Sequence, residues 1–292
     1  VDLIHTRTSN LYRIRDLNAP APYEITREDL DAVQDDPTRD PSDLVRSPAA
    51  ANETRPVDPR PGGARRITMT EMNGEARYWA ANVNLVKDRA DDRYSYRLSY
   101  TLSSRRNNTD DINFRAEDAN DFGDEWGPSV NDRRHVLSAI GSAYPSDRLR
   151  VTLAGLLQSG QPINRVPNAC APGEGSEGEI CFGTRDLNGD GTYRGGQYVG
   201  DSDRFPGASR NTDRLPWSYR LDLSAQYGWP IAGGRLVARA DVFNVLNTKN
   251  LSGYANNATQ SNQIQVGPPG SDIEEKTAGP PRQFQFGLRY EF

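Results

Sequence analysis

The sequence lacks the features that mark a membrane-spanning helix or a catalytic centre. It holds two cysteines, two histidines and two methionines among 292 residues. Its best apolar stretch, 151–157, is far shorter than the roughly 18 residues that a membrane-spanning helix needs. Zinc-protease, serine-hydrolase and phosphate-loop motifs are absent, and we expect its many acidic residues to lie in solvated loops. The sequence therefore predicts no transmembrane helix, no enzyme activity and no catalytic residue.

Charge and composition exclude further classes of protein. The 35 basic and 40 acidic residues are interspersed, so no nucleic-acid partner is expected. A mean hydropathy of −0.79, with 26 glycines and 20 prolines, is too polar and too interrupted for a thick core or long helices. The first residues, 1–4, resemble no signal peptide, so we expect a mature chain or part of a longer one. Disorder and a β-barrel with a wet lumen both remain compatible with these averages.

Strict alternation of apolar and polar residues favours the barrel. Between Trp217 and Trp229 every odd position is apolar or aromatic, and every even position is polar or glycine. At about 3.3 Å per residue and a tilt near 45°, these two residues are separated by roughly 28 Å along the membrane normal, close to the hydrocarbon thickness. We expect the aromatic residues of this segment to face lipid and its charged residues to face the lumen: Trp217, Tyr219, Tyr227 and Trp229 against Arg220 and Asp222.

The same alternation predicts eight strands, with the first and fourth alternating least cleanly: 1–16, 66–88, 93–105, 132–144, 148–159, 215–229, 234–246 and 282–292. Their connections are either tight turns, typical of the periplasmic side, or long segments rich in Pro, Gly, Asn and Asp, typical of extracellular loops: 19–64, 106–130, 160–213 and 247–281. The first long segment contains one expected short helix, at 25–33, with Thr26 as its N-cap.

Four short motifs at strand boundaries carry a family resemblance: Asn131-Asp132-Arg133-Arg134-His135, Ser159-Gly160-Gln161-Pro162, Asp241-Val242-Phe243-Asn244-Val245-Leu246-Asn247 and the run from Pro281 to Tyr290. In this order they resemble the C-terminal barrel of TonB-dependent receptors, particularly the Oar-like group with a carboxypeptidase-regulatory domain. The resemblance covers most of residues 1–292 and implies a 22-stranded barrel with an N-terminal plug. The plug, the TonB-contacting segment and more than half of the strands have no counterpart here.

The resemblance implies a function and a set of partners. We expect an outer-membrane barrel of a Gram-negative bacterium that takes up a scarce ligand, with outer-membrane lipid, the remaining barrel and plug, the TonB complex, the barrel-assembly machinery and other surface proteins as partners. The terminal residues Leu288, Tyr290 and Phe292 are similar to the assembly signal of such barrels, and equally suit a lipid-facing last strand. Two alternatives are a self-contained eight-stranded protein with a structural or adhesive role, and a secreted β-sandwich.

Several charged residues fall at inward positions of the predicted strands. We expect them to line the lumen, most of them in cross-strand charge pairs: Arg97, Arg150, Arg220, Asp222, Arg239, Asp241, Arg289 and Glu291. Closing eight strands on themselves would pack the arginines into a narrow interior with too few acids. We therefore expect an open, curved sheet in which 282–292 does not pair with 1–16.

Two loop features suggest local cross-links. Cys170 and Cys181 are spaced for a small disulfide, which requires an oxidising compartment, whereas a zinc site would lack nearby histidines. The segment 186–192 begins like a calcium loop, with oxygen donors at Asp186, Asn188 and Asp190. Its twelfth position is Gln197 rather than Glu, so calcium would need oxygens from Asp201 or Asp203, and metal-free Asx/Gly turns of this composition are common. We predict no other cofactor.

Overall fold

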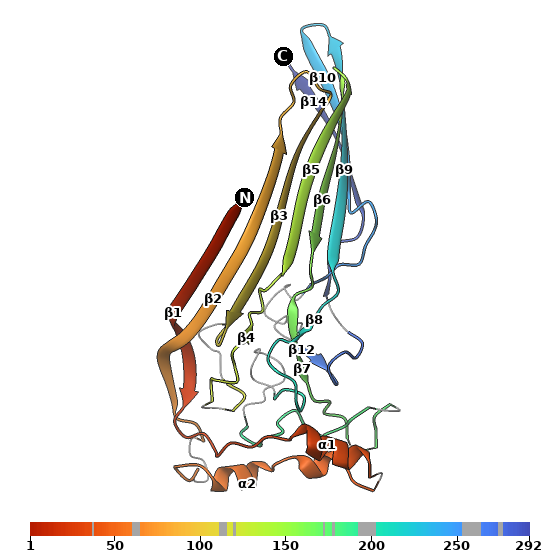
Figure 1. Ribbon diagram of the computed structural model, residues 1–292. Helices are drawn as coiled ribbons and strands as arrows, with labels where there is room; N and C mark the ends of the chain where they lie inside the picture. The colour runs from red at the N-terminus through yellow and green to blue at the C-terminus, as the bar shows by residue number, and fades with distance from the viewer. Residues whose placement is uncertain are drawn as a thin grey trace.

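The computed structural model describes residues 1–36, 38–59, 65–110, 116–118, 121–171, 173–176, 179–191, 203–252, 264–273 and 277–292. One antiparallel sheet dominates it, and the long strands follow one another in chain order, with the short β4 (Gly127–Pro128) attached to β3 (Figure 1). The long strands are β1 (Asp2–Asp16), β2 (Thr68–Lys87), β3 (Tyr94–Asn107), β5 (His135–Ser146), β6 (Leu149–Gln158), β9 (Ser218–Ile231), β10 (Gly234–Phe243) and β14 (Gln283–Glu291). All eight predicted strands are confirmed, with small differences at their ends.

The two strands with the weakest alternation carry irregularities of pairing. In β1 the register with β2 shifts between Thr8 and Leu11 and again before Arg13, and Asn10 between them has φ of 61°. In β5 the register with β6 shifts between Ala143 and Ser146, and the strand continues through Pro145 to the tight turn at 147–148. In β1 the extra residues move the following side chains to the other face, and this breaks the alternation in the sequence. In β5 the pairing is regular over 136–143, and the alternation is weak because the apolar Val136 and Ile140 lie on the polar face.

The long connections contain more regular structure than the sequence predicts. All of them lie at the same end of the sheet, with the two α-helices at the outer limit of this loop assembly (Figure 1). Their elements are α1 (Arg27–Gln34), η1 (Pro41–Leu44), α2 (Pro48–Glu53), β7 (Pro162–Val166), β8 (Asp213–Arg214), β11 (Leu251–Ser252), β12 (Ile264–Val266) and β13 (Thr277–Ala278). Strands β12, β7 and β8 form one small sheet, and β11 pairs with β13.

Helix α1 confirms the predicted short helix and its cap. The Thr26 hydroxyl accepts a hydrogen bond from the Asp29 amide at 3.1 Å, and the Asp29 carboxylate accepts one from the Thr26 amide at 3.0 Å. This reciprocal capping box satisfies two amides that a helix otherwise leaves unpaired. Leu30 and Val33 are buried on the inner side of the helix. No helix in the described segments is long and apolar enough to cross a membrane.

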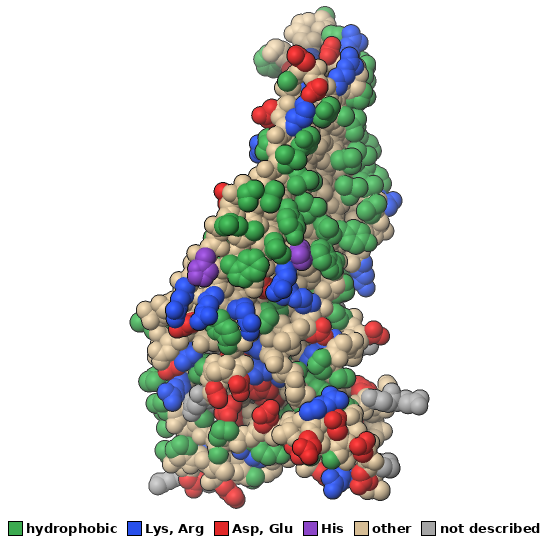
Figure 2. Space-filling view, viewed as in Figure 1, with side chains coloured by type: hydrophobic (Ala, Val, Ile, Leu, Met, Phe, Trp, Pro, Cys, Tyr) green, Lys and Arg blue, Asp and Glu red, His purple; other side chains and the backbone are tan. Residues whose placement is uncertain are grey.

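The cross-strand register gathers the apolar residues on one face of the large sheet. Tyr219 lies opposite Leu157, Leu157 opposite Leu137, Leu137 opposite Tyr100, and Tyr100 opposite Val83. Figure 2 shows hydrophobic side chains spread over this face of the strands. The largest hydrophobic side chains of β14 project freely from it, and Phe286 is 77% exposed. In water such a surface would be unfavourable, whereas in a bilayer it faces acyl chains.

The buried apolar core lies in the loop assembly and not in the sheet. Its residues come from α1 and from three separate loop segments: Ile25, Leu30, Phe182, Leu187 and Phe205. The Phe182 and Phe205 rings meet edge to face with their centroids 6.0 Å apart. The long loops therefore fold together as one packed body at the end of the sheet.

The sheet is open at both edges. Within the described residues, β1 pairs only with β2 and β14 only with β10. The prediction that the last strand does not pair with the first is therefore confirmed.

The two faces can be distinguished at neighbouring positions of one strand. Leu153 projects from the apolar face in the middle of β6, and Ala154 projects from the other face, opposite Asp222. We expect Leu153→Arg to lower the free energy of unfolding by about 2–4 kcal/mol, because it places a charge against lipid. Ala154→Arg is the matched control and should cost much less. Urea unfolding of the protein in phospholipid vesicles measures both, and equal losses would contradict this assignment of the faces.

Candidate functional site

The polar face of the sheet carries the predicted lumen residues. Arg97, Arg220, Asp222, Arg239, Asp241 and Arg289 all project from the face opposite the apolar one. On this face the Arg150 guanidinium also donates to the Ser142 hydroxyl at 3.1 Å. A face rich in guanidinium, hydroxyl and amide groups suits contact with water and not with acyl chains.

The ion pairs of this face run along the strands, and the prediction of cross-strand pairs is wrong for them. Arg220 contacts Asp222 at 2.8 Å, Arg239 contacts Asp241 at 2.7 Å, and Arg289 contacts Glu291. The residues opposite these arginines are uncharged; Arg220, for example, lies opposite Leu156. Because residues two apart share a face of a strand, each arginine reaches the acid two positions along its own strand. Each of these three positive charges is thus neutralised within its own strand.

Aromatic residues border the apolar face at both ends. At the end near the loops, the His135 ring stacks against Tyr100 and Trp217, with centroid distances of 6.2 and 5.6 Å, and its Nδ1 lies 2.8 Å from the Tyr100 hydroxyl. At the end with the tight turns, Tyr227 and Trp229 are in contact, as are Tyr290 and Phe292. Of the predicted lipid-facing residues, Trp217 thus lies in the first row and Tyr227 and Trp229 in the second, and Tyr219 lies on the same apolar face opposite Leu157. Such rows are typical of the two interfaces of a membrane.

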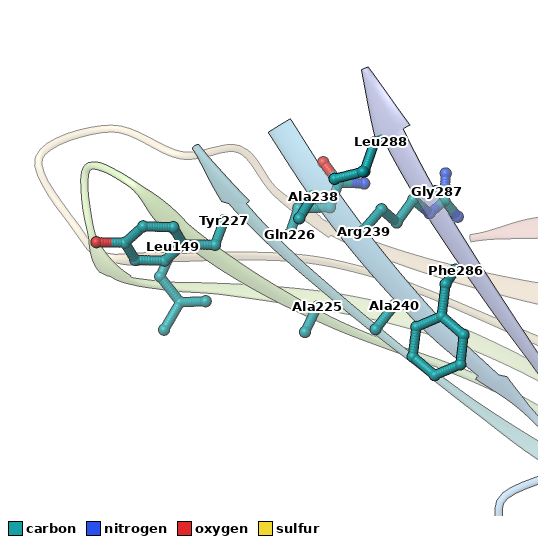
Figure 3. Close-up of a pocket in the computed structure, with 10 residues that line it drawn as sticks. All are labelled: Leu149, Ala225, Gln226, Tyr227, Ala238, Arg239, Ala240, Phe286, Gly287 and Leu288. Atoms are coloured by element: carbon teal, nitrogen blue, oxygen red, sulfur yellow. The ribbon is translucent and has the colours of Figure 1, made fainter. Parts of the chain in front are cut away.

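A shallow groove crosses the apolar face near the tight turns (Figure 3). Three small residues, Ala225, Ala238 and Ala240, lie between the bulky side chains of Leu149, Tyr227, Phe286 and Leu288, and the groove has a volume of about 530 Å³. Gln226, Arg239 and Gly287 complete its lining. Its apolar character and its place among lipid-facing residues suit an acyl chain.

The resemblance motifs turn out to fasten the loop assembly to the strands. Asp132 is buried, pairs with Arg214 at 2.5 Å and accepts a hydrogen bond from the Arg105 amide. Gly160 lies so close to Leu215 that an added Cβ would be 1.5 Å from the Leu215 carbonyl oxygen. Asn244 has φ of 50° and donates to the carbonyl groups of two other loop residues. Three of the four motifs therefore have a structural role at a strand end.

Buried ion pairs hold the loops together, which corrects the expectation that the acidic residues lie in solvated loops. Arg204 contacts Glu117 at 2.6 Å and Glu125 at 2.9 Å, although these residues lie 87 and 79 positions away. Arg210, 1% exposed, pairs with Asp110 at 2.7 Å. A buried charge is tolerated when it is paired and hydrogen-bonded. Sequence reasoning missed this network because its members are far apart along the chain.

The calcium-like segment is closed by hydrogen bonds to protein groups. The Asp203 carboxylate accepts from the amides of Leu187 and Asn188, and the Asn188 side chain accepts from the Asp190 amide at 2.8 Å. Arg55 donates to the Asp190 carbonyl at 2.7 Å. Carboxylates of this segment are not gathered within reach of one ion among the described residues. The predicted donor Asp201 and the twelfth position, Gln197, lie outside the described residues, so calcium binding stays a prediction.

A cavity of about 570 Å³ opens between the loops beside this segment. Tyr23, Leu187 and Phe205 contribute to its wall, together with a mostly acidic set of side chains: Glu24, Glu117, Asp118, Asp121, Asp124, Asp203 and Arg204. Burial raises the pKa of Glu117 to about 7, although the nearby Arg204 guanidinium opposes this shift. Burial, together with the charge of Glu117, also raises the pKa of Asp203 well above its usual range. The cavity would suit a polar or cationic group better than an anion.

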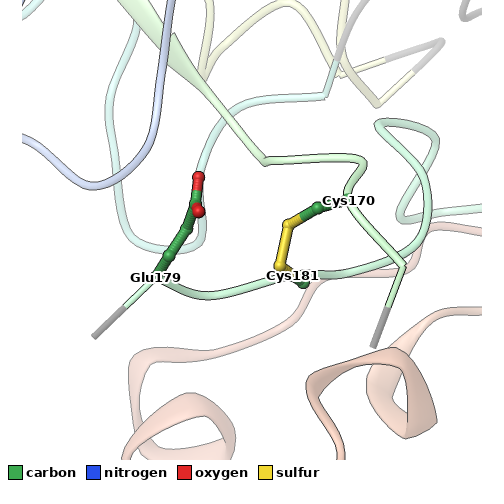
Figure 4. A group of neighbouring side chains, drawn as sticks. All are labelled: Cys170, Glu179 and Cys181. Carbon is green, nitrogen blue, oxygen red and sulfur yellow. A yellow bond between two sulfur atoms is a disulfide. The ribbon is translucent and has the colours of Figure 1, made fainter. Parts of the chain in front are cut away.

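The predicted disulfide is present. Cys170 and Cys181 are bonded, with their Cα atoms 5.0 Å apart, and the Glu179 carboxylate lies beside the sulfur atoms (Figure 4). These three residues would resemble a metal-binding group if the cysteines were free thiolates. Because both sulfurs are used in the disulfide, the cluster is a loop cross-link.

A family model described as an outer membrane beta barrel domain matches residues 4–145, which span β1 to β5. No curated protein matches the chain. The family match agrees with the antiparallel sheet, its apolar outer face and its two aromatic borders. The chain is accordingly an all-β outer-membrane barrel segment, and it resides in the bacterial outer membrane in contact with lipid.

The raised pKa values predict a pH dependence of the loop assembly. Folding raises the pKa of Glu117 from 4.5 to about 7, so between these values the folded state binds more protons than the unfolded state. We therefore expect the stability contributed by Glu117 to be fully present below about pH 4.5, to be lost as the pH rises through about 7, and to change little above it. Hydrogen exchange of loop peptides, corrected for intrinsic rates, measures this at pH 5.5 and 8.

Glu117→Gln should flatten this pH profile without abolishing it, because Asp203 shifts in the same direction. Glu28→Gln is the control, since Glu28 is an exposed residue of α1. An unchanged profile in Glu117→Gln would contradict the assignment.

The disulfide should stabilise its loop locally. The two cysteines are 11 residues apart, and closing a loop of this size contributes about 3 kcal/mol by restricting the unfolded chain. We expect reduction to increase proteolysis between 168 and 187 while the sheet stays intact. In a Cys170→Ser/Cys181→Ser double variant, the reductant should have no further effect. Two thiols that react with an alkylating agent before reduction would rule the disulfide out.

Proposed function

We propose that this chain forms part of the wall of a TonB-dependent uptake receptor, whose long loops bind a scarce ligand at the cell surface and whose lumen conducts it. The observation that carries the proposal is the open sheet of eight long strands. In lipid each unpaired backbone group at a sheet edge costs several kcal/mol, so further strands must complete the barrel. The additional strands can belong to the same polypeptide or to another.

The polar face supports a wide, hydrated lumen. Arg97 is exposed on it, and Arg220, Arg239 and Arg289 each have an acidic partner on their own strand. A barrel of eight strands has an interior filled by side chains, where these long polar groups would be crowded and desolvated. In a wider barrel they remain in contact with water, which suits the passage of a solute.

The loop assembly supports a binding role at the outer end of the lumen. It has its own apolar core, buried ion pairs, a disulfide and an acidic cavity of about 570 Å³. Loops held in fixed positions can offer a preformed site, which reduces the entropy lost on binding.

Conductance tests the proposed lumen. We expect the protein purified from outer membranes to open a large conductance in planar bilayers when urea displaces a plug. Arg97→Glu should then shift the reversal potential in a salt gradient toward cation selectivity, because it reverses a charge on the lumen face. Arg97→Lys, which keeps the charge, is the matched control. Absence of conductance under all conditions would favour the self-contained eight-stranded barrel with a structural or adhesive role.

Binding of the periplasmic domain of TonB tests the receptor class separately. The purified full-length protein should bind this domain, and an unrelated periplasmic protein should not bind. A conducting protein that fails to bind TonB would be a passive porin and would overturn the uptake part of the proposal.

A further inference from the structure

Three arginines form a row across the first three strands. Arg7 lies directly opposite Arg77, and Arg77 lies directly opposite Arg106. Residues opposite one another on neighbouring strands have Cβ atoms about 4.5–5.5 Å apart, and like charges in such pairs are destabilising. A row of three positive charges therefore calls for an anion that compensates them.

The described residues supply little of that compensation. Among the described residues, the single ion pair of this row joins Arg7 to Glu75 at 3.2 Å. The Trp126 ring lies 5.1 Å from the Arg77 guanidinium carbon, and the Trp126 carbonyl accepts from Arg106 at 3.2 Å. These contacts orient two guanidinium groups without neutralising them, and all three arginines remain exposed. The row keeps a net positive charge of about two even when Glu75 is included.

The position of the row shows which anion can reach it. Arg77 shares the apolar face with Trp79, two residues along the same strand, and Arg7 likewise lies two residues beyond His5. The row thus follows directly after the aromatic border, on the side of the loops. Figure 2 shows basic side chains gathered along this lower limit of the hydrophobic surface, next to the histidines. At this height the outer face of a membrane strand meets lipid headgroups.

We infer that Arg7, Arg77 and Arg106 bind the phosphate-bearing headgroup of an anionic lipid in the outer leaflet. A guanidinium group can bind phosphate with two parallel hydrogen bonds. Each arginine near an anionic membrane surface also strengthens the binding of the protein to that surface. The lipid's acyl chains would lie along the apolar face on the side of the row away from the loops, so charge and hydrophobic contact act together. Glu75 positions Arg7, and Trp126 positions Arg77 and Arg106. This inference depends on contact between the apolar face of the sheet and the membrane, and it does not depend on the proposed uptake of a ligand.

The test compares two variants that each lose two positive charges. Arg77→Gln/Arg106→Gln removes the centre of the row, and Arg27→Gln/Arg39→Gln removes two exposed arginines of the loop assembly as the matched control. Full-length protein in neutral detergent is titrated with phosphorylated lipid A and, separately, with its dephosphorylated form and with inorganic phosphate. Heat unfolding reports binding, and native mass spectrometry reports retained lipid.

We expect phosphorylated lipid A to raise the unfolding temperature of the wild-type protein and of the control. The Arg77→Gln/Arg106→Gln variant should bind it at least about tenfold more weakly. Without lipid this variant should be as stable as the wild type or more stable, because a like-charge contact is removed, and this separates lost binding from lost folding. An equal response to dephosphorylated lipid, or equal affinities of the two variants, would overturn the inference. A response to inorganic phosphate alone would assign the row to a free anion and would equally overturn it.

Discussion

In a bilayer every backbone N–H and C=O group needs a partner within the protein, because no water reaches it. This requirement fixes the long antiparallel strands, since each pairs along its length with its neighbours. Side chains then alternate between two environments, with Leu221 and Leu223 on the apolar face and Arg220 and Asp222 on the polar face. The same requirement applies to the edges of β1 and β14, where we propose that further strands attach. The two faces of the sheet and this proposal both depend on it.

The loop assembly and the sheet differ in which side chains they bury. In the strands apolar side chains are exposed and charged side chains pair along the surface, whereas in the loops apolar side chains form a core and charges are buried. Glu125 and Arg210 are each 1% exposed. Water surrounds the loops and lipid surrounds the strands, so the two parts of one chain have opposite patterns of burial. The transition occurs at the aromatic border near His135, followed by the arginine row on β1, β2 and β3.

The resemblance motifs lie at this transition, and the structure explains their chemistry. Asp132 binds Arg214 and caps the end of β3 through the Arg105 amide. Gly160 leaves room for the Leu215 carbonyl, and Asn244 adopts a left-handed conformation where β10 ends. Where a strand leaves the lipid, its backbone groups lose their hydrogen bonds to the neighbouring strands. Within one or two residues they need side-chain hydrogen bonds instead. Short polar residues and glycine achieve this exchange at least steric cost.

The sequence by itself determined the eight strands, the two faces of Trp217 to Trp229, the capped helix at Thr26 and the cysteine pair. Each of these depends on residues close in sequence or on a period of two, so local stereochemistry is sufficient. Tertiary structure decided the remainder: the pairing of Arg204 with Glu117 and Glu125, the acidic cavity, and the alignment of Arg7, Arg77 and Arg106. These features join segments tens of residues apart. Their geometry depends on how the loops fold together and on the strand register, including the bulges in β1. The periodicity of the sequence specifies neither the loop packing nor the register.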